Sequence, residues 1–171
     1  AVASAVYGAG ASRPVAVSAL WGWAVLAMAL VYTVRTGAAI SAAVPQGVIY
    51  LSQSFLGFAN VRHFAQLMPM VMPLLAAGCL PPAPGVEGAL SHRAFRPLCA
   101  VALVAWCVLL WLNGSAGAFY AIVLALAATA LMAGWHRSWR LLATMAVAAL
   151  AAMVLVQILN AWVPVLSGVQ K

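Results

Sequence analysis

The sequence predicts an all-α protein, a polytopic membrane helical bundle with about five transmembrane helices plus one interfacial or re-entrant segment. Of its 171 residues, 67% are hydrophobic and only 5% are charged, which is outside the usual composition of soluble domains. Several apolar runs also approach the roughly 20 residues that a helix needs to cross the hydrocarbon core of a bilayer. We therefore expect a single membrane domain over residues 1–171, with the lipid bilayer as its main partner.

The first predicted span covers residues 15–34, between Arg13-Pro14 and Arg35. As a helix this run would be about 30 Å long, enough to cross the hydrocarbon core. The segment 36–58 that follows is interrupted by several Ser and Gln residues and by Pro45-Gln46-Gly47, which would break a helix. We expect this segment to lie at the membrane interface or to re-enter the membrane.

Four more spans are expected, near residues 64–80, 98–112, 116–133 and 141–163. Pro69 and Pro73 should kink the first of them. The second and third are short and flank Asn113-Gly114-Ser115, so this turn could sit below the outer membrane surface and leave a polar hollow. A thinner or less tilted hairpin explains the same lengths equally well.

The basic residues fix the expected orientation across the membrane. They are scattered in ones and twos and form no patch, so we expect no nucleic-acid partner. With five spans, one side would carry the larger group of basic residues, and the positive-inside rule places that side in the cytoplasm. This group is Arg13, Arg93, Arg96, Arg137 and Arg140; the outer group is Arg35, Arg62 and Lys171.

One short stretch concentrates polar residues next to the hydrocarbon phase. Asn60, Arg62, His63 and Gln66 lie within seven positions, at the start of the second predicted span. Asn60 is a suitable N-cap, and Arg62 and His63 each share a helix face with Gln66. The free N–H groups of the first turn, the positive end of the helix dipole and a guanidinium would bind an anion such as a lipid phosphate. The simpler reading is that Arg62 and His63 only anchor a helix end among lipid headgroups.

Missing residue types exclude several chemistries. Glu87 is the only acidic residue, so carboxylate pairs and acidic magnesium sites cannot be assembled. Glu87 is predicted on the cytoplasmic side, so no Ser-His-acid triad can be assembled on the outer face. We expect no metal and no cofactor, because the three histidines are predicted on both sides of the membrane and show no shared ligand set. The cysteines lie in apolar surroundings and are expected to be buried thiols, not disulfides: Cys79, Cys99 and Cys107.

The run GFANVRHFAQLMPMVMPLL at 57–75 resembles a signature of the bacterial O-antigen ligase/polymerase superfamily. There, Gly-Phe-x-Asn-x-Arg-x-Phe-x-Gln at the outer face precedes a span with Pro-Leu-Leu. The run NGSAGAF at 113–119 is similar to the family's Ser-Arg-Gly-Ala turn. These enzymes are metal-independent membrane glycosyltransferases of lipopolysaccharide biosynthesis and related pathways. They take a glycan from undecaprenyl diphosphate at the periplasmic face of the inner membrane.

By this resemblance Arg62 would bind the carrier diphosphate, and the site would be completed by Asn60, His63, Gln66 and Ser115. Ala116 stands where the family's second Arg is expected. The family's large periplasmic loop with its catalytic His is not found after the last span, so no catalytic residue is assigned. We expect the middle portion of such a protein, or a truncated and inactive relative. An O-antigen polymerase, a protein O-oligosaccharyltransferase relative and a non-catalytic helical membrane assembly protein are the alternatives.

Overall fold

The computed structural model describes residues 12–43, 61–81, 93–113, 116–133 and 135–162. The described residues form five helices and contain no strand, so the predicted all-helical bundle is confirmed. The helices are α2 (Ser12–Ala43), α4 (Val61–Cys79), α5 (Phe95–Asn113), α6 (Ala116–Ala133) and α7 (Trp135–Trp162).

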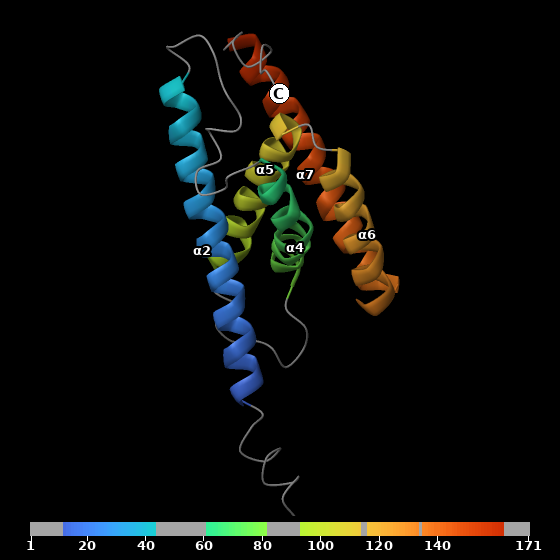
Figure 1. Cartoon of the computed structure of the whole chain (residues 1–171). Coiled ribbons are helices and arrows are strands. Elements are labelled where there is room, and N and C mark those ends of the chain that lie inside the picture. The colour runs from blue at the N-terminus through green and yellow to red at the C-terminus, as the bar shows by residue number, and fades with distance from the viewer. Residues whose placement is uncertain (1–11, 44–60, 82–92, 114–115, 134, 163–171) are drawn as a thin grey trace, which may run out of the picture.

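Consecutive helices of this bundle run in opposite directions. The rings of Trp23 and Phe95 lie 4.9 Å apart and the Trp106 indole reaches Ala29, so α2 and α5 are parallel. Arg96 at the start of α5 donates from Nε to the Cys79 carbonyl oxygen at the end of α4, so these two helices are antiparallel. Figure 1 shows α4 and α5 in the middle, with α2 on one side and α6 and α7 on the other. Helix α4 packs against all four other helices.

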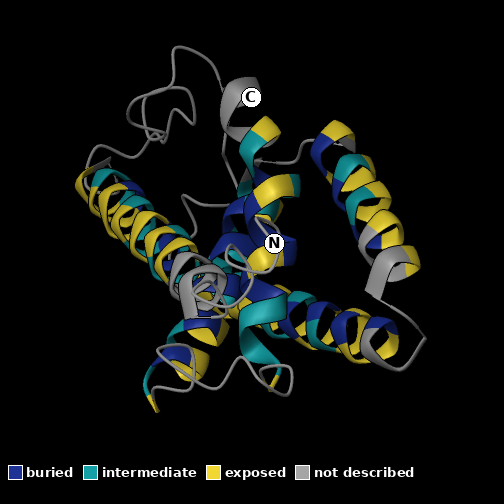
Figure 2. Ribbon diagram, turned by 90° about the horizontal axis from the view of Figure 1, so that it is seen from below, coloured by how far each residue is buried: buried dark blue, intermediate teal, exposed yellow. Residues whose placement is uncertain are grey.

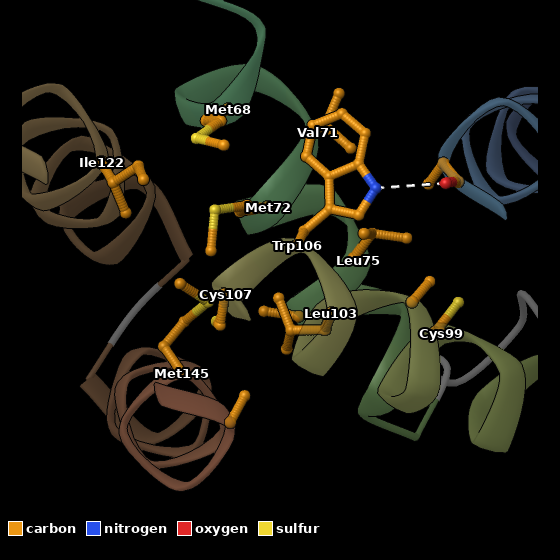
Figure 3. Packing of buried hydrophobic residues seen from close by; sticks show 14 of the residues in the cluster. Met68, Val71, Met72, Leu75, Cys99, Leu103, Trp106, Cys107, Ile122 and Met145 are labelled. Atoms are coloured by element: carbon orange, nitrogen blue, oxygen red, sulfur yellow. Dashed lines mark hydrogen bonds between the residues drawn. The ribbon is translucent and has the colours of Figure 1, made fainter. Parts of the chain in front are cut away.

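The core lies where α4 and α5 meet their neighbours. Figure 2 shows the buried parts of the helices turned toward the middle of the bundle and the exposed parts turned outward. On α4 the buried positions recur every three or four residues, as one face of a helix requires. Trp106 is fully buried among them (Figure 3). The buried residues of α4 are Met68, Val71, Met72, Pro73, Leu75 and Ala76.

The three cysteines are free thiols in this core. Cys99 and Cys107 are buried, and Cys79 is half-buried. The Cys79 thiol donates a hydrogen bond of 3.2 Å to the carbonyl oxygen of Leu75, one turn earlier on α4. The prediction of buried thiols is thus confirmed for Cys99 and Cys107, whereas Cys79 is only half-buried.

Three helices are long and apolar enough to cross a membrane. They are Leu20–Ala42 of α2, Phe95–Leu112 of α5 and Ser138–Ala161 of α7. The apolar parts of the other two helices are shorter, Gln66–Cys79 in α4 and Gly117–Ala128 in α6. All three long segments carry large apolar side chains on their outward surface, for example Val31, Val101 and Val154, as lipid-facing helices do.

Helix boundaries differ from the predicted spans at the start of α7, which begins at Trp135 and not near residue 141, and above all in α2. This helix does not end at Arg35 but continues to Ala43, so the first residues of the predicted interfacial segment, 36–43, are helical. The run after Arg35 is rich in Ala and contains no Pro before Pro45, so nothing in it breaks the helix. Thr36 is also fully buried, which ties this extension to the bundle. Residues 44–58 of the predicted segment lie outside the described residues.

Candidate functional site

The candidate site is built on the first two turns of α4. This helix begins at Val61, so Asn60 is the residue that immediately precedes it, as expected of an N-cap. The first turn therefore contains Arg62 and His63, next to backbone N–H groups that have no partner within the helix. These groups and the helix dipole make the start of α4 favourable for an anion.

The predicted site residues are described to different extents. Arg62, His63 and Gln66 lie on two successive turns of α4, and the side chain of Gln66 is exposed. The side chains of Arg62 and His63 are outside what the structure describes, and so are Asn60 and Ser115 entirely. The structure thus brings three of the five residues onto one helix and does not describe how the other two lie.

Gln66 lies on the outward surface of α4 together with two large apolar residues. Met70 and Leu74 follow it at intervals of four residues, and both are exposed. The opposite side of the helix carries Met68 and Met72, which pack into the core. Position 62 is one turn before Gln66 on the same helix, so the polar start of α4 continues into an apolar outward stripe.

The end of α5 is set back from the end of α2 on this side of the bundle. The Trp106 Nε1 atom lies 3.1 Å from the Ala29 carbonyl oxygen, so these residues mark one level on the two helices. Beyond this level α2 continues to Ala43, about 21 Å of helix, whereas α5 continues only to Asn113, about 10 Å. The start of α6 at Ala116 follows directly, so the hairpin of α5 and α6 is shorter than its neighbour α2.

Other polar atoms are buried on this side of the bundle, and none of them belongs to the predicted site residues. The hydroxyl oxygens of Tyr32 and Thr36 on α2 are buried, and so is the Oδ1 atom of Asn160 near the end of α7. Asn160 Oδ1 has no hydrogen-bond partner among the described residues. The sequence did contain a signal for Asn160, because Gln157 and Asn160 are the only strongly polar residues in the otherwise apolar run 141–163.

No protein-family model, curated protein or solved structure was found to match this chain.

Proposed function

We propose that this chain is a multi-span protein of the bacterial inner membrane that binds a glycan linked to undecaprenyl diphosphate at the start of α4. The observation that carries the proposal is the start of α4 at Val61, which puts Arg62 and His63 in its first turn. A guanidinium beside free N–H groups suits a diphosphate, because both supply charge-assisted hydrogen bonds to phosphate oxygens. The resemblance of residues 57–75 to the O-antigen ligase-like family points to the same ligand.

The membrane part of the proposal is supported by helix length and direction. Three helices can cross a membrane, and consecutive helices alternate in direction, as a chain that crosses repeatedly requires. This alternation puts Arg93 and Arg96 at the end of the bundle opposite Arg62. With the more basic end in the cytoplasm, the start of α4 faces the periplasm.

The activity we propose is transfer of the glycan from its carrier to an acceptor. In this reaction the sugar carbon exchanges its bond to the diphosphate for a bond to an acceptor hydroxyl, and the diphosphate leaves with its charge held by Arg62. His63 is positioned in sequence to carry the proton lost by the hydroxyl. An O-antigen polymerase or a protein O-oligosaccharyltransferase relative uses the same donor with a different acceptor.

A non-catalytic membrane assembly protein is the second candidate. The neutral Ala116 as the first residue of α6 favours it, because the related enzymes are expected to have a second Arg there. Under this reading Arg62 anchors the end of α4 among headgroups and has no selective ligand.

Binding to undecaprenyl diphosphate separates these functions. Purified protein in nanodiscs would be titrated with the diphosphate and monophosphate carriers, for wild type, Arg62→Ala, Arg62→Lys and Arg35→Ala. Losing a hydrogen bond to a charged group costs about 1.5–3 kcal/mol, which is roughly ten- to a hundredfold in affinity. We expect that loss for Arg62→Ala and a partial loss for Arg62→Lys, because Lys lacks the planar fork. Arg35 is exposed on α2, and its variant should bind like wild type. Equal affinities of wild type and Arg62→Ala would exclude the diphosphate site.

A further inference from the structure

A long apolar groove runs between α2, α5 and α7 on the outside of the bundle. Its volume is about 750 Å³. Helix α5 forms its floor, and α2 and α7 form its two walls. The walls and floor include Gly37 and Ile40 of α2, Val104 and Val108 of α5, and Leu155 and Leu159 of α7.

The groove is lined almost entirely by apolar side chains. Its lining contains two hydroxyl groups, and both donate their hydrogen to the backbone of α2. Thr33 Oγ1 donates to the Ala29 carbonyl oxygen at 2.8 Å, and Ser41 Oγ donates to the Ala38 carbonyl oxygen at 2.9 Å. A polar ligand would lose its hydrogen bonds to water here and gain few in return, so an apolar ligand is favoured.

The position of the groove matches that of a lipid chain. The three helices that line it are the same three that are long and apolar enough to cross a membrane. Along α5 the lining extends from Ala100 to Leu112, about 18 Å of helix. One leaflet occupies about 15 Å, half of the hydrocarbon core. Val101 on the rim is 62% exposed, so the groove opens sideways to the surroundings.

A peptide segment fits this groove poorly. A membrane-spanning helix is about 30 Å long, whereas the groove extends over only about 18 Å of α5. An extended segment would bring its own N–H and C=O groups against a lining that offers them few partners. A flexible hydrocarbon chain has neither problem.

We propose that this groove binds one hydrocarbon chain of a phospholipid, from the leaflet that contains the C-terminal halves of α2 and α7. The inference rests on the membrane placement proposed above, and it does not require glycan transfer. The lipid chain fills the space between α2 and α7, which would otherwise leave the side chains on both walls without packing partners.

Gly37 offers a way to block the groove without disturbing the protein. A Cβ atom at this position would meet no atom within 4 Å, so a larger side chain has room to enter. Gly37→Leu should therefore fill part of the groove, while the neighbouring Ala38→Leu adds the same side chain at an exposed position outside the lining. Both variants end with the same Leu side chain, although Gly37→Leu adds one carbon atom more, and the two side chains differ in whether they enter the groove.

The test measures bound phospholipid on wild type, Gly37→Leu and Ala38→Leu after extraction in mild detergent, by native mass spectrometry. The melting temperature of each delipidated protein is then recorded with and without added phosphatidylethanolamine and phosphatidylglycerol. We expect wild type and Ala38→Leu to retain one phospholipid and to gain thermal stability when lipid is added. Gly37→Leu should retain none and gain nothing.

Two results would overturn the inference. Gly37→Leu could retain phospholipid and respond to it like wild type, which would mean that no chain lies at position 37. Alternatively, Gly37→Leu could dissociate a dimer with no change in bound lipid, which would assign the groove to a second copy of the chain. Titration of Gly37→Leu with undecaprenyl diphosphate distinguishes these failures from failure of the proposed function. If Gly37→Leu still binds undecaprenyl diphosphate, and this binding still depends on Arg62, the proposed function stands even though the groove holds no lipid.

Discussion

The indole of Trp106 on α5 donates a hydrogen bond of 3.1 Å from Nε1 to the carbonyl oxygen of Ala29 on α2 (Figure 3). The same oxygen accepts a hydrogen bond from Thr33 Oγ1, one turn later on α2. The Tyr32 ring lies 6.1 Å from the Trp106 ring, so α2 surrounds the indole with both a polar and an aromatic contact. A polar group buried between apolar helices needs a partner, and this bond links the N-terminal helix to the centre of the bundle.

Replacing Trp106 should weaken the packing of α2 on α5. Trp106→Phe removes the indole donor, and interhelical hydrogen bonds in membranes are worth about 0.6 kcal/mol on average and up to about 1.7 kcal/mol. Unfolding of the purified protein by heat or by SDS would measure the loss. Trp111→Phe is the matched control, because Trp111 is 53% exposed on the same helix. Equal stability of the two variants would show that the hydrogen bond contributes little.

Gly78 should tolerate a methyl group much less well than Gly37. A Cβ atom at Gly78 would lie 2.7 Å from Cys99 Sγ and 3.4 Å from the Phe95 ring. We expect Gly78→Ala to destabilise the protein by about 1–3 kcal/mol, the usual effect of overpacking. Gly37→Ala meets open space and should be neutral or stabilising by up to about 1 kcal/mol, because Ala favours a helix over Gly.

A double-mutant cycle identifies the cause of the Gly78 effect. Cys99→Ala removes the sulfur atom that the new methyl would meet, so it should recover much of the stability lost in Gly78→Ala. Thermal unfolding of the two single variants and the double variant would measure this coupling. Additive effects of the two substitutions would mean that the close approach of Gly78 to Cys99 is not what limits this position.

The direction of the helices predicts which positions reach each side of the membrane. In a Cys79→Ala background, Arg62→Cys should react with an impermeant maleimide from the periplasm and Arg137→Cys only from the cytoplasm. Cys99 and Cys107 are buried and should stay unlabelled. Labelling of position 62 from the cytoplasm, or of position 137 from the periplasm, would reverse or reject the proposed topology.

Adding a cation at the start of α6 tests whether this helix lies beside the proposed diphosphate site. Ala116 is the first residue of α6, where the resemblance leads us to expect Arg. Ala116→Arg should tighten binding of undecaprenyl diphosphate by roughly tenfold or more, since a hydrogen bond to a charged group contributes about 1.5–3 kcal/mol. Titration in nanodiscs would measure this gain, with Leu131→Arg as a control because Leu131 is exposed near the other end of α6. The same gain in both variants would indicate nonspecific attraction to an added charge.

The sequence by itself determined that the protein is helical and where most of its helices lie. Long apolar runs separated by Pro, Gly and charged residues predict helices of membrane-spanning length, because only a helix satisfies its backbone within such a run. The start of α4 was also predictable, since Asn60 is a suitable N-cap and the helix begins directly after it at Val61. Cys99 and Cys107 were expected to be buried for the same compositional reason.

Only the tertiary structure decided which faces of these helices meet. The membrane-length parts of α2, α5, α6 and α7 carry apolar residues on every side, so their sequences do not indicate an inward side, whereas α4 has a clear buried stripe. The hydrogen bond between Trp106 and Ala29 and the close approach of Gly78 to Cys99 each join residues more than 15 positions apart in the sequence. The open space at Gly37 exists because no such distant residue packs there. The continuation of α2 past Arg35 also depends on tertiary packing. Burial of Thr36 in the bundle favours a helix where the polar residues that follow had predicted an interfacial segment.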